Sequence, residues 1–303
     1  MYPWLEPVQF RMQESFARSR FHHAQLIHGL QGVGKSELSR ALSEGLLCVN
    51  SVEALSSCGV CKSCLLIKAQ NHPDLLYLSA DSSSIGVDEI RTLNEFVFHS
   101  AQQGGNKVVV IEQIEKMTES AANALLKTLE EPAAKRYILM TCNDVSKVKA
   151  TVLSRCNQVQ VSITDKRVSQ QWLAEQGISS SAYPWVDIFS DQPLLLSKWA
   201  QLEVISEVDY LWKVSHDIAS ISDVNALETT LTKDASLLSV FARFLMQVIK
   251  QQLTAQNIGF VQFHNCTVQI EKYMSDHHRI LGINKTLSLS NLVFGLQRVL
   301  KQD

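Results

Sequence analysis

The sequence predicts an α/β domain built on a five-stranded parallel sheet, followed by a helical remainder. Three observations predict it. In the first half of the 303 residues, short apolar runs alternate with segments of helical spacing. The runs are apolar at consecutive positions, as expected of strands buried on both faces. After about residue 163 the strand signal disappears, while helical periodicity continues almost to the end. The length is too great for one small core.

The apolar runs place five strands in the first half of the chain. The clearest is Lys107-Val-Val-Val-Ile111, where β-branched residues follow one another. Parallel strands joined by right-handed helical crossovers make a RecA-like α/β core. The expected strands are 25–28, 75–79, 108–112, 137–141 and 158–161.

Helices are expected between and after these strands. Within the sheet region they cover 35–47, 87–100 and 119–131, the last ended by Pro132, with a short turn at 151–154. A helix over 165–176 ends at Gly177, and two more helical segments reach about residue 201. Helices over 235–252, 262–277 and 287–301 follow, with breaks at Gly259 and Gly282. The chain therefore divides into a sheet domain (1–163), a small three-helix module (164–203) and a helical bundle (204–303).

Composition excludes some classes of protein. Hydrophobic residues make up 46%, and the formal net charge is -2. A self-sufficient nucleic-acid binder normally has a basic face, so this balance argues against one. The opening residues lack a basic segment leading into an apolar core, and the apolar runs are far too short to span a membrane. We expect a cytoplasmic protein.

A phosphate-binding loop is predicted between the first strand and the first helix. Its sequence is Gly29-Leu-Gln-Gly-Val-Gly34-Lys35-Ser36. Such a segment presents backbone N–H groups to phosphates at a helix N-terminus. Lys35 would reach the terminal phosphates of ATP, and the Ser36 hydroxyl would bind Mg²⁺. The alternative is a glycine-rich turn that binds nothing.

The acidic pair that a nucleotide hydrolase needs is incomplete. Glu112 follows the third strand and would serve the metal, whereas Gln113 stands where a carboxylate would polarise the attacking water. A neutral amide cannot accept that proton, so we expect weak binding of ATP without efficient hydrolysis. Asn143, after the fourth strand, would contact a γ-phosphate or belong to an ordinary turn.

Four cysteines form a candidate metal site. Cys48, Cys58, Cys61 and Cys64 lie within seventeen residues. In a reducing compartment such clusters bind metal rather than forming disulfides. Four thiolates make a closed tetrahedral zinc site, which is structural because no position is open for chemistry. The alternative is a reduced surface cluster of accidental spacing. The module at 48–64 is too short to hold a core of its own, so zinc would fold it.

Taken together, these motifs resemble a known family. The phosphate loop and the cysteines are joined by His72-Pro73-Asp74, residues 85–91, the string 121–132 (Ala-Ala-Asn-Ala-Leu-Leu-Lys-Thr-Leu-Glu-Glu-Pro) and Ser154-Arg155-Cys156. The set resembles the bacterial replicative clamp loaders, within the AAA+ ATPases. The resemblance covers the first 160 residues, and the remainder is similar in layout. It implies an AAA+ domain with a zinc-binding insertion, a helical lid and a C-terminal collar that joins subunits. It also implies that Arg155 is an arginine finger acting in trans.

Departures from the family pattern indicate which kind of subunit is present. Motor subunits would have an Asp-Glu pair at Glu112-Gln113 and a lid arginine within 191–196, and both are absent. The resemblance therefore implies a stator of the delta-prime type, a part of the DNA polymerase III holoenzyme with no polymerase activity of its own and little or no ATPase. Its implied partners are the gamma/tau and delta subunits, with the sliding clamp and primed DNA reached through the complex, and no membrane. The alternatives are an ATP-hydrolysing gamma/tau-type subunit and, less favoured, a P-loop kinase with a zinc insertion.

Overall fold

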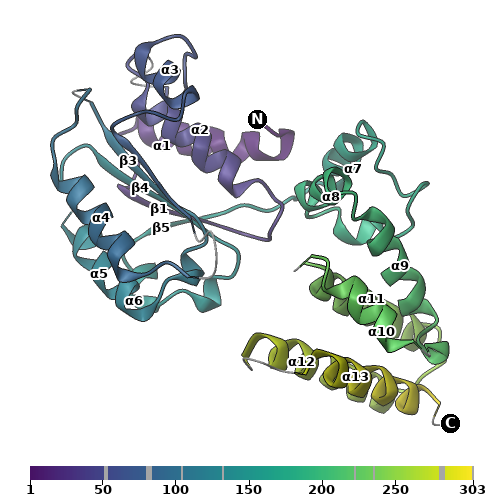
Figure 1. The fold of residues 1–303 in the computed structure, drawn as a ribbon. Coiled ribbons are helices and arrows are strands. Elements are labelled where there is room, and N and C mark those ends of the chain that lie inside the picture. Colours follow the sequence, from purple (N-terminus) through teal and green to yellow (C-terminus); the bar gives the residue numbers. More distant parts are fainter. Residues whose placement is uncertain are drawn as a thin grey trace. The chain divides into compact units, whose positions relative to one another are not determined.

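The computed structural model describes residues 1–50, 54–79, 84–103, 105–131, 133–221, 223–234, 236–279 and 284–301. It divides the chain into two compact units (Figure 1). The first comprises Met1–Ser179 and Val186–Ser197, and the second comprises Ser180–Trp185 and Lys198–Asp303. Three positions named from the sequence, Pro132, Ala235 and Gly282, lie outside the described residues.

The first unit contains the predicted parallel sheet. Five strands lie in the order β2-β3-β4-β1-β5, and every pair is parallel. Each observed strand begins and ends within one residue of the expected run, so the five-stranded sheet is confirmed. The strands are β1 (Ala24–His28), β2 (Leu75–Leu78), β3 (Lys107–Ile111), β4 (Arg136–Cys142) and β5 (Asn157–Gln160).

Helices cover both faces of this sheet. In β3, Val108 and Val110 pack into a core with α2, whereas Val109 and Ile111 pack into a second core with α4 and α5. This alternation follows from the pleat of a strand, in which successive side chains point to opposite faces. Figure 1 shows α1 and α2 on one face and α4 and α5 on the other. These helices are α1 (Glu6–Ala17), α2 (Lys35–Leu47), α4 (Val87–Phe98) and α5 (Glu119–Glu130).

Short elements complete the first unit. Two helices were not expected from the sequence: α1, which buries only Val8 and Met12, and α3, with seven residues inside the cysteine insertion. Neither carries a full apolar stripe, so periodicity could not reveal them. The remaining elements are η1 (Pro3–Leu5), α3 (Lys62–Lys68), η2 (Ile114–Lys116), η3 (Val145–Lys147), α6 (Ala150–Leu153), α7 (Lys166–Ala174), η4 (Val186–Phe189) and α8 (Pro193–Gln201), which ends in the second unit.

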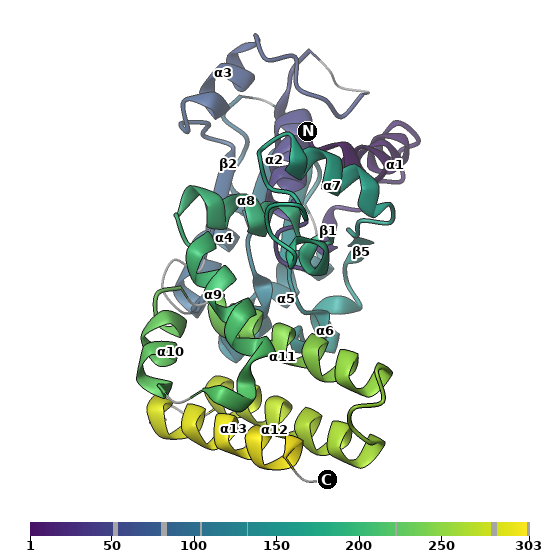
Figure 2. The same cartoon turned by 90° about the vertical axis from the view of Figure 1, so that its right-hand side faces the viewer.

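The second unit is helical, as predicted. Its core includes Trp185, Trp199 and Phe244. The ring centroids of Trp199 and Phe244 each lie 6.3 Å from that of Trp185. Helix α11 buries a full face, including Phe241 and Phe244, and α12 packs between α11 and α13 (Figure 2). The helices are α9 (Ile205–His216), η5 (Ile218–Ser220), α10 (Val224–Leu231), α11 (Leu237–Thr254), α12 (Phe260–Arg279) and α13 (Lys285–Leu300).

Within the described ranges, every helix is too short or too polar to traverse a bilayer.

Helix α5 tests how strongly the sheet depends on its cover. Leu125 of this helix is fully buried in the core with β3 and β4. Replacing it with alanine should lower the free energy of unfolding by about 2–5 kcal/mol, because a cavity is left against the sheet. Lys127→Ala, on the exposed side of the same helix, is the control and should change the free energy by less than about 0.5 kcal/mol. Chemical denaturation measures both. Equal effects of the two substitutions would contradict this packing.

Candidate functional site

The phosphate loop joins β1 directly to α2. Gly34 precedes the helix with φ of 95°, and a Cβ there would lie 2.8 Å from the Leu5 side chain. At Gly29 a Cβ would lie 2.1 Å from the carbonyl oxygen of Val161. Both positions therefore require glycine. Lys35 and Ser36 are the first two residues of α2, and Ser36 is exposed. The strand, loop and helix order predicted for a phosphate site is present.

Lys35 is bound within its own loop. Its Nζ donates hydrogen bonds to Gly29 O (2.9 Å), Leu30 O (2.8 Å) and Asn143 Oδ1 (2.8 Å). These three bonds use all the hydrogens of the ammonium group. Lys35 is 7% exposed, and burial lowers its pKa to about 8. The structure thus brings Lys35 and Asn143 together, and it holds the lysine on the protein's own oxygens.

An acidic side chain that the sequence analysis missed lies in this network. Glu115 Oε1 accepts a hydrogen bond from the backbone N–H of Asn143 at 2.9 Å. Its other oxygen, Oε2, is buried and makes no hydrogen bond with the described residues. The charge of Glu115 is the strongest influence that keeps the pKa of Lys35 from falling further. Its position depends on Gln113, whose left-handed φ of 56° turns the chain into η2. No sequence pattern announces that turn.

Glu112 has a different environment. It directly follows β3, and its N–H donates to Leu78 O at 2.8 Å. Its half-buried side chain lines a cavity of about 770 Å³ with Tyr77 and Ser79. Its charge acts on Lys35 more weakly than that of Glu115. The backbone N–H of Gln113 donates to Thr141 Oγ1 at 3.1 Å. The carboxyl ends of β3 and β4 are thereby tied together beside the loop.

Two further segments bind the outer side of the loop. The N-terminal part of α8 contributes Leu194, whose N–H donates to Gly32 O at 3.0 Å. Just before this helix, Gln192 Nε2 donates to Gln31 O at 2.9 Å. From the other side Trp4 Nε1 donates to Val33 O at 2.9 Å. These bonds satisfy carbonyl groups that a glycine-rich loop would otherwise leave open, and they fix the loop's shape.

The four cysteines of the insertion come together as predicted. All four Sγ atoms lie within 4.8 Å of one another. The Cys48–Cys61 and Cys58–Cys64 pairs are 3.9 and 4.0 Å apart, close to the ~3.8 Å edge of a tetrahedron whose metal–sulfur bonds are about 2.3 Å. Hydrogen bonds from backbone N–H groups lower the pKa of Cys58 to about 6, and the N–H of Val60 has the largest effect. The cluster fits a metal ion held by four sulfurs.

His72 attaches this insertion to the sheet. Its ring Nε2 lies 3.1 Å from Ser63 Oγ of α3, and its Nδ1 accepts from the Asp74 N–H at 3.1 Å. The fully buried carboxylate of Asp74 accepts from the N–H groups of Gln102 and Gln103, both at 2.8 Å. The His72-Pro73-Asp74 motif therefore organises backbone around β2. Burial lowers the pKa of His72, which favours its neutral form.

Arg155 lies just after α6, on the surface of the first unit. Its Nε donates to Glu130 Oε1 at 2.6 Å, and its Nη1 donates to Thr151 O at 2.9 Å and to Ser154 Oγ at 3.2 Å. The side chain is 34% exposed. The guanidinium is thus accessible but paired with the last residue of α5. No sequence pattern indicates Glu130 as its partner.

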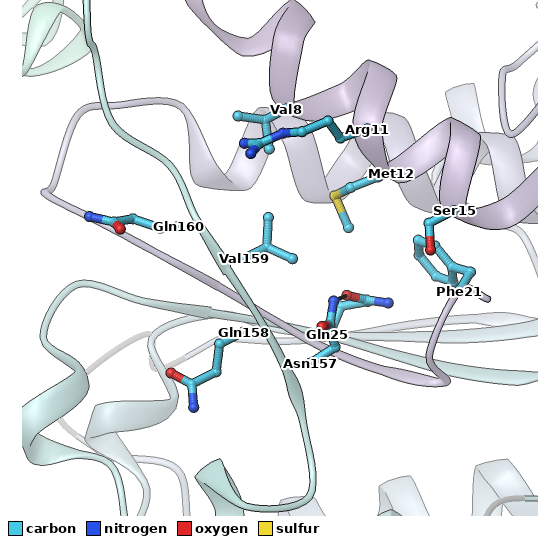
Figure 3. Close-up of a pocket in the computed structure, with 10 residues that line it drawn as sticks. All are labelled: Val8, Arg11, Met12, Ser15, Phe21, Gln25, Asn157, Gln158, Val159 and Gln160. Atoms are coloured by element: carbon cyan, nitrogen blue, oxygen red, sulfur yellow. Dashed lines mark hydrogen bonds between the residues drawn. The ribbon is translucent and has the colours of Figure 1, made fainter.

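The edge strand β5 begins two residues after Arg155. It pairs with β1 on one side, and Asn157 Nδ2 donates to Gln25 Oε1 at 2.7 Å. A groove of about 250 Å³ lies between β5 and α1 (Figure 3). In it, Val159 faces Met12, and Arg11 extends along the helix above the strand. These contacts hold the segment that follows Arg155 in a defined position.

Comparison with known proteins places this chain among subunits of a bacterial DNA polymerase. A family model described as "DNA polymerase III, delta subunit" matches residues 6–165. The DNA polymerase III subunit delta' of Haemophilus influenzae is 41% identical over 174 residues, 57% of this chain and 53% of that protein. The subunit tau/gamma of the same organism is 37% identical over 156 residues, 52% of this chain and 22% of that protein. The chain spans about half the length of the delta' relatives it matches.

A solved structure shows the same fold. It is a DNA polymerase III gamma subunit-related protein from Thermotoga maritima, with a TM-score of 0.53 and 20% identity, covering 98% of this chain and 99% of that chain. At this identity the likeness concerns the fold alone. The family model, in contrast, matches more than half of the sequence and includes the phosphate loop, the cysteines and Arg155. The chain therefore belongs to the family described as DNA polymerase III, delta subunit.

Proposed function

We propose that this chain is a stator of the delta-prime type in the DNA polymerase III clamp loader. It would help to place the sliding clamp on primed DNA, in the cytoplasm, and lend Arg155 to the ATP of a neighbouring subunit. The observation that carries the proposal is the contrast between two sites in one domain. The nucleotide site lacks a carboxylate at Gln113, which follows β3, whereas Arg155 is accessible at the surface.

The chain's own pocket suits weak binding of ATP and Mg²⁺ rather than turnover. The elements of a phosphate site are present in Gly29, Gly34, Lys35 and Ser36. Asn143 accepts a hydrogen bond from Lys35. ATP would supply phosphates that replace the oxygens now bound to Lys35. Glu112 is available for the metal, but hydrolysis also requires a base to polarise water, and the amide of Gln113 cannot serve.

Arg155 can change partners at small cost. Its pair with Glu130 is partly exposed on both sides, with side-chain exposures of 34% and 46%. Exposed ion pairs contribute only about 0–1 kcal/mol. A γ-phosphate offers more charge than one carboxylate and fits the forked guanidinium, which is always protonated. On assembly the side chain would therefore leave Glu130 for the phosphate of a neighbour.

We further propose that Cys48, Cys58, Cys61 and Cys64 bind structural zinc and fold the insertion at 48–64. The donor set supports zinc, since four thiolates at these separations suit a closed tetrahedral site. The division into an AAA+ domain (1–163), a lid (164–203) and a collar (204–303) stays a prediction. So do the partners, which are the gamma/tau and delta subunits and, through the complex, the sliding clamp and primed DNA.

Two observations favour the alternative of an ATP-hydrolysing gamma/tau-type subunit. Lys35 and Ser36 are intact, and the tau/gamma relative shares much of this domain. Gln113 and the absence of arginine from residues 191–196 weigh against it. The P-loop kinase reading has no further support, because the chain belongs to a polymerase III family.

Arg155→Ala in a complex reconstituted with motor subunits tests the main proposal. At the single ATP site that Arg155 faces, turnover should fall by about 10³-fold or more, because an arginine finger stabilises charge in phosphoryl transfer. Lys35→Ala should barely change turnover. Arg167→Ala is a matched control, since Arg167 is exposed and paired with Asp165. Steady-state ATPase assays measure all three.

Undiminished turnover with Arg155→Ala would sink the stator role. Turnover by the isolated chain at the rate of a motor subunit would instead favour the gamma/tau alternative.

The metal site makes a separate prediction. Elemental analysis of the purified chain should find one zinc per molecule. Cys61→Ser should lose it, because three thiolates hold the ion less tightly. Cys156→Ser, outside the cluster, is the control and should retain it. The zinc assignment fails if the wild-type chain carries none when folded in zinc-containing medium.

A further inference from the structure

We propose that Glu115 is an internal anion that competes with nucleotide phosphates for the Lys35 network and so weakens ATP binding by this chain. The inference rests on the proposed function, to which it adds a physical cause for weak nucleotide binding. It concerns affinity, whereas Gln113 concerns hydrolysis.

A continuous set of contacts links Glu115 to Lys35. The carboxylate holds the backbone N–H of Asn143, and the side-chain oxygen of Asn143 holds the ammonium group. Two loop carbonyls take the other ammonium hydrogens. A phosphate must displace at least one of these three acceptors. Displacing the Asn143 side chain moves a residue whose backbone N–H is held by the Glu115 carboxylate.

The charge of Glu115 also acts directly. Its Oε2 atom is buried, with the neutral Cys142 thiol beside the carboxylate, so solvent screens this charge only weakly. Lys35 and Glu115 together carry no net charge, which leaves the loop less attractive to a polyanion. Burial and then the charge of Glu115 raise the pKa of Cys142 to about 12, so that thiol stays protonated and adds no second negative charge beside Glu115. A triphosphate would enter a site that already holds its own anion.

The local backbone makes this placement specific. Gln113, in the left-handed conformation, turns the chain away from the direction of β3. Its N–H donates a hydrogen bond to Thr141 Oγ1 near the end of β4. Glu115 then lies in η2, where its carboxylate accepts the backbone N–H of Asn143, two residues after Thr141. A glutamate one position earlier or later in a three-residue helical turn would point elsewhere. The anion is therefore placed by the same turn that carries Gln113.

Binding of a fluorescent ATP analogue to the isolated full chain, with Mg²⁺ at pH 6.5 and fixed salt, tests the inference. Glu115→Gln should tighten binding by about tenfold, because it removes the charge and keeps an oxygen for the Asn143 N–H. Glu37→Gln is the control: Glu37 is exposed in the first turn of α2 and acts on Lys35 through charge alone. Solvent screening should keep its effect below about threefold.

Glu115→Ala is measured beside Glu115→Gln, with thermal unfolding of each, so that a folding defect in one variant does not decide the result. Adding Lys35→Ala should abolish the gain, which locates it at the loop. Unchanged or weaker binding by folded Glu115 variants, or an equal gain in Glu37→Gln, overturns the inference. Because the assay uses the isolated chain, its result is independent of the Arg155 test in the complex.

The pH dependence supplies a second readout. The titratable groups that act on Lys35 are Glu115, Cys142, Glu37 and Glu112, and His28 also interacts with it. Lys35 is protonated below its pKa of about 8, so affinity of the wild type should fall about tenfold between pH 7 and 9. Glu115→Gln removes the charge that most raises the pKa of Lys35, so burial lowers this pKa further. The fall in affinity should therefore begin at lower pH in this variant. An identical pH profile for both proteins would contradict the role of Glu115.

Discussion

Burial of a parallel sheet on both faces is the constraint on which the candidate sites depend. Because all five strands run in one direction, the loops after β1, β3 and β4 meet at one edge. The segments that follow these strands carry Lys35 at the start of α2, Glu115 in η2, and Asn143. The apolar side chains of β3 and β4 do no chemistry, yet they set the strand order that brings these polar groups together. Sites at the carboxyl edge of such sheets follow from this geometry.

Much of this arrangement could be predicted from sequence because it rests on short-range patterns. Consecutive β-branched residues revealed Lys107–Ile111, and glycine spacing revealed the loop before α2. Cysteine spacing revealed a cluster whose sulfurs do converge. These signals are written in neighbouring residues, so no knowledge of the tertiary structure was needed to read them.

The missed features depend on contacts between distant segments. Glu115 matters because a left-handed residue turns it toward Asn143, and nothing in the local sequence marks Gln113 as left-handed. Glu130 matters because the end of α5 lies beside Arg155, which is 25 positions away. Helix α1 has too few apolar residues to show a period, and it is held by packing against the sheet. Tertiary context decides such cases.

Helix α2 has a consequence that reaches beyond either of its ends. It begins at Lys35, and the residue after its last turn is Cys48. Thirteen residues make a rod about 20 Å long, and Leu38, Leu42 and Leu46 clamp it along its length to the core. One stiff element thus joins the loop proposed to bind phosphates to the cysteine cluster proposed to bind zinc. Loosening of the cysteine end would free the last turn of this helix, while Leu38 and Leu42 still hold its first turns against the core.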